Sequence, residues 1–201
     1  MPKFFIFLEI TDPEINALIW AITEIVTGQA PTQPFHMTVR GPYEQPICRS
    51  TLKSCQDVMA YDVLEIGQVG RFSNPGEETV LFRIDSPNLR KIWWKPDFSI
   101  KKFGFNPHIS LYRGPDAHFA DRIAAFLEQE EITLLCAEYR LVPHVTKQLD
   151  LFPSKVPITK QFLGLLNSGR VHITFLMRLE RMVRDYRRSP WVFGSKEPIT
   201  A

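Results

Sequence analysis

The chain has 201 residues, of which 44% are hydrophobic, 12% aromatic and 23% charged. This composition excludes a largely disordered, collagen-like or coiled-coil chain, and the length suits roughly one domain. The 24 Lys and Arg residues nearly balance 22 Asp and Glu, and the net charge of +2 gives no overall indication of a nucleic-acid partner.

The sequence favours a cytoplasmic protein. The apolar run at Phe4–Leu8 is too short for a signal peptide, and no stretch approaches the roughly 18 apolar residues of a membrane span. The three cysteines, Cys48, Cys55 and Cys136, are an odd number without a C-x-x-C pair. They indicate a reducing compartment and predict neither a disulfide framework nor a zinc site. We expect no metal, no cofactor and no membrane contact.

The first half of the chain predicts the order strand, helix, strand, helix, strand. Runs of β-forming residues predict the strands, and apolar residues at helical spacing predict the helices. Asp12 before Pro13 is typical of a helix start, and Gly28 ends that helix. The expected segments are strand 4–10, helix 13–27, strand 35–40, helix 46–60 and strand 63–72.

The same order recurs from residue 79. The expected segments are strand 79–84, a helix starting at Ser86-Pro87, strand 107–112, helix 117–129 and strand 134–142. The repeat predicts an α+β, bilobal domain over residues 1–152, with pseudo-two-fold duplicated β-α-β-α-β lobes at about 1–76 and 77–152. We expect antiparallel sheets to line a central groove between the lobes.

One strand of each half carries a histidine motif. His36-Met37-Thr38 in the first half corresponds to His108-Ile109-Ser110 in the second, and a Gly-Pro pair follows each strand. Because residues i and i+2 of a strand share a face, each histidine lies beside the hydroxyl of Thr38 or Ser110. We expect the two strands to bring both pairs into one groove.

Two imidazoles and two hydroxyls suit chemistry on a phosphodiester. One neutral histidine takes a proton from the attacking oxygen, and the other, protonated, gives a proton to the leaving oxygen. The hydroxyls donate to the non-bridging oxygens, where negative charge builds up. The sequence leaves open which histidine is the base.

The H-x-S/T pattern also occurs at His144 and His172, so the tripeptide alone does not select the pair. Only His36 and His108 lie in the repeated strand that precedes a Gly-Pro pair. His144 ends a strand without a matching copy, and His172 lies among apolar residues, which favours a core or helix-face histidine.

The paired H-x-T-V and H-x-S-L strands resemble those of the two-histidine (2H) phosphoesterase superfamily, especially its bacterial RNA 2′,5′-ligase-like, 2′,3′-cyclic phosphodiesterase group. The resemblance covers residues 3 to about 145. It implies metal-independent hydrolysis or transfer at a 2′,3′-cyclic phosphate or a 2′,5′ phosphodiester of a nucleotide or RNA end. Carried over, His36 and His108 are the catalytic pair, and Thr38 and Ser110 bind the phosphate.

Strand alternation adds weaker candidates for substrate binding. It places Arg40 and Tyr112 on the faces of the two histidines, and it turns Arg113 away unless a β-bulge re-aims it. A solvated strand end is an equally good interpretation of Arg40 and Arg113. An aromatic wall for a base or ribose has four candidates, namely Tyr43, Phe72, Trp94 and Tyr112.

Residues 153–201 are expected to form a helical extension. Residues 170–188 hold six arginines against Glu180 and Asp185, a local balance of +4. An apolar stripe from Phe175 to Tyr186 favours an amphipathic helix packed on the lobes, with arginines in water. Contact with an RNA backbone, or with a partner protein, is the alternative.

Two other functions fit the same residues. The groove could hold a nucleotide or RNA end as a non-catalytic binding module, or it could degrade a cyclic oligonucleotide messenger. The sequence ranks neither the substrates nor the oligomeric state.

Overall fold

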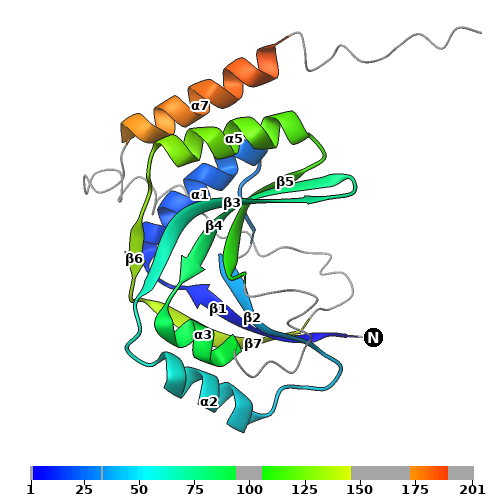
Figure 1. Ribbon diagram of the computed structural model, residues 1–201, viewed down its shortest axis with the longest axis vertical. Helices are drawn as coiled ribbons and strands as arrows, with labels where there is room; N and C mark the ends of the chain where they lie inside the picture. Colours follow the sequence, from blue (N-terminus) through cyan, green and yellow to red (C-terminus); the bar gives the residue numbers. More distant parts are fainter. Residues whose placement is uncertain (1, 33, 94–105, 146–172, 190–201) are drawn as a thin grey trace, which may run out of the picture.

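The computed structural model describes residues 2–32, 34–93, 106–145 and 173–189. These residues form an α+β fold with two antiparallel sheets, one of which curls into a half-barrel (Figure 1). The three-stranded sheet has the order β2-β1-β7, and the four-stranded sheet has the order β5-β4-β3-β6. The strands are β1 Phe4–Ile10, β2 His36–Tyr43, β3 Leu64–Asn74, β4 Glu77–Asp85, β5 His108–Gly114, β6 Leu134–Cys136 and β7 Tyr139–Val145.

The described residues form five helices, of which four pack on the two sheets and the fifth packs on other helices. Helices α1 and α5 pack on the four-stranded sheet and α7 packs on them, whereas α2 and α3 cover the three-stranded sheet. The layers follow one another from α7 down to α2 in Figure 1. The helices are α1 Pro13–Thr27, α2 Arg49–Met59, α3 Pro87–Trp93, α5 Ala117–Gln129 and α7 Ile173–Arg188.

The helices begin where short polar side chains accept hydrogen bonds from free backbone N–H groups. The Asp12 carboxylate accepts from the N–H groups of Glu14 and Ile15, at 2.9 and 3.0 Å, and Asp116 accepts from Phe119 N–H at 2.9 Å. Such a cap is worth about 1 kcal/mol. At the other end of α1, Gly28 has φ +74°, the left-handed conformation that glycine adopts at least cost.

Each sheet contains strands from both halves of the chain. The turn at Pro75-Gly76 joins β3 directly to β4, and β7 crosses back to pair with β1. Neither sheet is therefore contained within residues 1–76 or 77–152, the lobes expected from the sequence repeat. The tight turn explains this, because a short connection between consecutive antiparallel strands favours their pairing.

The single strand expected over residues 134–142 is wrong. The chain leaves the four-stranded sheet after β6 and enters the three-stranded sheet at β7, and Ala137 and Glu138 lie between them. The Glu138 carbonyl accepts hydrogen bonds from the N–H groups of Thr11 and Asp12, at 2.9 and 3.0 Å. These bonds hold the crossing point against the end of β1.

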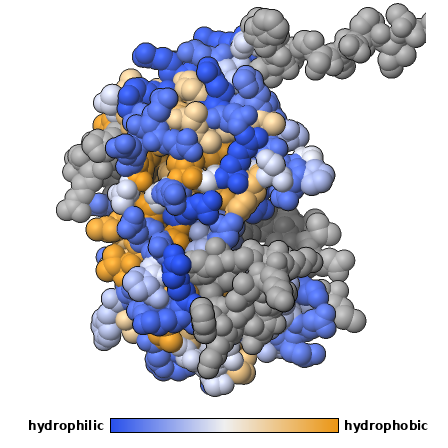
Figure 2. Space-filling view, in the orientation of Figure 1, coloured by the Kyte–Doolittle hydropathy of each residue, from blue (hydrophilic) through white to orange (hydrophobic). Residues whose placement is uncertain are grey.

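Helix α7 packs as an amphipathic helix on the other helices, as its apolar stripe predicts. Phe175, Leu176, Leu179 and Val183 are buried in the same core as both sheets. Arg181, Arg184 and Arg188 are exposed, and hydrophilic residues cover the outer side of α7 in Figure 2. The rest of the extension, including His172, lies outside the described residues.

No helix in the described part of the chain has the length and hydropathy needed to cross a membrane. No disulfide bond joins Cys48, Cys55 or Cys136, all of which lie in the described part of the chain.

Candidate functional site

The two motif histidines line one cavity between the sheets. His36 is the first residue of β2 and His108 the first residue of β5, and both line a cavity of about 1010 Å³ together with Thr38 and Ser110. These four residues therefore share one groove, as the sequence predicts. The two histidines come from different sheets and are 72 residues apart in the chain.

Both imidazole rings are held in the same way. Nδ1 of His36 lies 3.1 Å from the Pro34 carbonyl oxygen, and Nδ1 of His108 lies 2.8 Å from the Asn106 carbonyl oxygen. A carbonyl oxygen only accepts, so Nδ1 carries the hydrogen in each ring. Nε2 is then the nitrogen available to a substrate, as a base in the neutral ring and as an acid in the protonated ring.

A β-bulge in β2 turns Arg40 away from the cavity. In the pairing with β1, Ile6 lies opposite Arg40 and Phe7 opposite Thr38, which leaves Val39 as the extra residue. The alternation of faces breaks there, and an Arg40 Nη donates at 3.1 Å to the Ile92 carbonyl oxygen of α3. The prediction that Arg40 shares the face of His36 and Thr38 is wrong for this reason.

A bulge at the corresponding point of β5 exchanges Tyr112 and Arg113. Val80 of β4 lies opposite Tyr112 and the next residue lies opposite Ser110, so Leu111 is the extra residue. Tyr112 is 8% exposed and packs edge-on against Phe119 of α5, so its prediction as a substrate-binding residue is wrong.

Arg113 faces the cavity instead, and one of its Nη atoms donates to Ser110 Oγ at 3.3 Å. The sequence predicts that Arg113 faces the groove only if a β-bulge turns it there, and the bulge at Leu111 does so. Its guanidinium group and the Ser110 hydroxyl form a pair of donors suited to phosphate oxygens.

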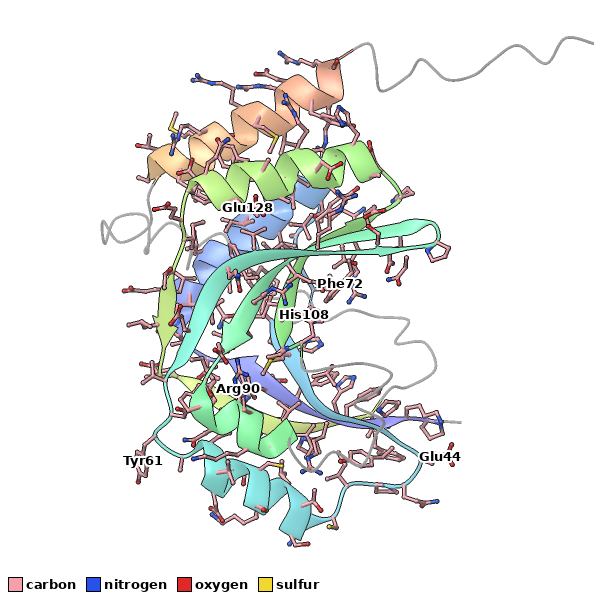
Figure 3. All side chains as sticks on the ribbon, in the orientation of Figure 1. Glu44, Tyr61, Phe72, Arg90, His108 and Glu128 are labelled. Carbon is pink, nitrogen blue, oxygen red and sulfur yellow. The ribbon has the colours of Figure 1, made fainter. Side chains whose placement is uncertain are left out.

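Aromatic rings hold both histidines. Phe7 of β1 lies between His36 of β2 and His144 of β7, with ring centroids 4.1 and 4.3 Å away and all three rings nearly parallel. Phe72 of β3 meets His108 edge-on at 5.0 Å, and Figure 3 shows the two side chains next to each other between the sheets. Of the aromatic wall candidates, Phe72 lines the cavity, whereas Trp94 lies outside the described residues.

His108 has two arginines as neighbours. Arg83 lies directly opposite it on β4, and Arg113 follows it on β5. Burial lowers the pKa of His108 below its ordinary value of 6.5, and the positive charges of Arg113 and Arg83 lower it further. The hydrogen bond to the Asn106 carbonyl acts in the opposite direction. The ring is therefore mostly neutral at pH 7.

Sequence reasoning missed several residues of the site because their contacts cross strands. Arg83 and Phe7 are ordinary strand residues in the sequence, and His144 approaches His36 only because β7 crosses to β1. A strand-pairing hypothesis would have been needed to find them. Within the described ranges, no group of three His, Cys, Asp or Glu side chains is placed to hold a metal ion.

Comparison with known proteins adds no relative. No family model, curated protein or solved structure matches this chain. The resemblance to the 2H phosphoesterases stays a prediction carried by the motif strands.

Proposed function

We propose that the protein is a metal-independent 2H phosphoesterase. Its substrates are 2′,3′-cyclic phosphate ends of nucleotides or RNA, or 2′,5′-type phosphodiester bonds. The observation that carries the proposal is the pair of matched imidazoles in one cavity, each with Nδ1 on the carbonyl oxygen two residues earlier and a hydroxyl two residues later.

The proposal includes a pseudo-two-fold relation between the two halves of the chain. Each half has a strand, a helix and a motif strand with a bulge after the hydroxyl residue, so that Arg40 corresponds to Tyr112 and Gly41 to Arg113. Such a relation places the two histidines on opposite sides of one phosphorus atom, where an in-line displacement needs its base and its acid.

The chemistry follows from this placement. A water oxygen attacks the phosphorus of the cyclic phosphate, and one neutral histidine takes the proton that the water releases. The bond from phosphorus to one ribose oxygen breaks, and the other, protonated histidine gives that oxygen a proton. Thr38, Ser110 and Arg113 donate to the non-bridging oxygens as charge builds up on them.

The test is turnover of a nucleoside 2′,3′-cyclic phosphate in the presence of a chelator. We expect His36→Ala and His108→Ala each to lower kcat about 10²- to 10⁴-fold, since each removes one proton-transfer role. His118→Ala is the matched control, because His118 is an exposed residue of α5 whose ring contacts Tyr186 of α7. Wild-type rates in both motif variants would overturn the proposal.

The alternatives have their own outcomes. Tight binding of a non-hydrolysable nucleotide without any product would favour the binding module, and turnover confined to cyclic oligonucleotides would favour degradation of a messenger. For an RNA that extends beyond the cavity, we propose the exposed arginines of α7 as the backbone contact. We place this activity in the cytoplasm, since the three cysteines form no disulfide bond.

A further inference from the structure

Arg83 is a cation beside the site that the proposed reaction does not use. Its place opposite His108 puts its side chain on the same face of the four-stranded sheet. One of its Nη atoms donates to the side-chain oxygen of Asn106 at 3.0 Å, and Asn106 lines the cavity. Arg83 is not among the described residues that line the cavity, but Asn106, which also holds His108, keeps its guanidinium group next to the cavity.

The sheet leaves room for this guanidinium group. A Cβ atom at Gly70 would lie 3.2 Å from Arg83 Nε and 2.8 Å from the Leu81 side chain. Any larger residue there would displace Arg83 or Leu81. The glycine therefore lets the arginine lie flat on the sheet, next to the site.

The charge of Arg83 is not neutralised within the described part of the chain. On the same sheet, Arg71 pairs with Glu78 at 2.9 Å and also with Asp121. Arg83 and Arg113 have no carboxylate partner among the described residues. They lie at the two ends of the His108–Ser110 motif, where an anionic substrate would neutralise both charges.

The cavity has room for more than the reacting group. Its volume of about 1010 Å³ lies at the upper end of the range for small-molecule sites. Phe5 and Phe72, from different sheets, also line it and offer surfaces on which bases can stack. Of the arginines that line it, Arg71 is already paired with carboxylates, so a single cyclic nucleotide held by Arg113 leaves part of this space, and the neighbouring Arg83, unused.

We propose that Arg83 binds a second phosphate of the substrate, one nucleotide away from the reacting phosphate. The preferred substrate is then a linear oligonucleotide end of at least two nucleotides, and a mononucleotide is a poor one. This inference rests on the proposed function, and it names Arg83 as the residue that sets the substrate length.

The experiment compares a nucleoside 2′,3′-cyclic phosphate with a dinucleotide that ends in the same cyclic phosphate. We expect the wild-type protein to prefer the dinucleotide in kcat/KM by about 10- to 100-fold, the worth of one charged hydrogen-bonding contact. Arg83→Gln should abolish this preference, mainly through KM, and Arg83→Lys should restore part of it. Arg90→Gln is the matched control, since Arg90 is an exposed residue of α3 that pairs with Asp85 at 3.4 Å.

The ratio of the two substrates isolates the second phosphate, because both depend equally on the protonation of His108. An equal loss on both substrates in Arg83→Gln, or an unchanged preference, would overturn the inference and leave the proposed function standing. If the wild-type protein turns over neither substrate, the proposed function fails. In that case, calorimetry of the binding of a dinucleotide 3′-phosphate tests the role of Arg83 by itself. Weaker binding by Arg83→Gln than by the wild-type protein supports this role, and equal affinity refutes it.

Discussion

At the scale of single residues, the surroundings of His108 set its proton affinity. Burial of the ring and the charges of Arg113 and Arg83 all disfavour the imidazolium form. The ring therefore stays neutral to a lower pH than a free histidine. Under the proposed function, we infer that His108 is the base of hydrolysis and His36 the acid.

This arrangement predicts a shifted titration. We expect the His108 resonance, identified by its loss in His108→Ala, to titrate below pH 6.5 in a nuclear magnetic resonance experiment. Arg113→Gln removes one of the charges that lower the pKa, so it should move the titration to higher pH. The acid limb of kcat/KM should move in the same direction, because protonation removes the base.

Arg90→Gln serves as the control for a change of net charge, because Arg90 is not among the charges that lower the pKa of His108. A His108 that titrates at or above its ordinary value in the wild-type protein would contradict the assignment of the base.

At the scale of elements, the sequence predicted most of the strands and helices, because hydrophobic periodicity and capping residues are local signals. The motif strands carried both histidines and both hydroxyls into the cavity as expected. The bulges could not be predicted from the alternation of faces, because that pattern assumes a regular strand. They bring Arg113 rather than Tyr112 to the cavity, and they turn Arg40 away from it. The break between β6 and β7 after Cys136 was not predicted either, because it depends on pairing with strands far along the chain.

The contacts of α7 with the rest of the fold predict how it contributes to stability. Leu179 is fully buried between α7 and the helices beneath it, and the Tyr186 hydroxyl donates to the Asp116 carboxylate at about 3.0 Å. We expect Leu179→Ala to lower the free energy of unfolding by about 2–5 kcal/mol, measured by urea denaturation. Arg184→Ala, on the exposed face, should change it by less than about 0.5 kcal/mol.

An equal, small effect of both substitutions would mean that α7 does not pack on α1 and α5 in solution.

At the scale of the whole molecule, the two sheets make the halves of the chain depend on each other. Residues 1–76 contain β1 and β3 but lack β7 and β4, with which these strands pair. Helix α1 belongs to the first half, yet it packs on β5 of the second. The site has the same dependence, because its two histidines come from opposite halves of the chain and line one cavity only when both sheets are complete.

A cut at the Pro75-Gly76 turn tests this dependence directly. We expect a fragment of residues 1–76 to stay unfolded alone, with little chemical-shift dispersion and no cooperative thermal transition, because β3 has lost its partners on both sides. Addition of the fragment 77–201 should restore both the chemical-shift dispersion and the cavity. The cut itself removes no core contact, because the turn is exposed. A fragment 1–76 that unfolds cooperatively by itself would show instead that the repeat in the sequence is also an independent folding unit.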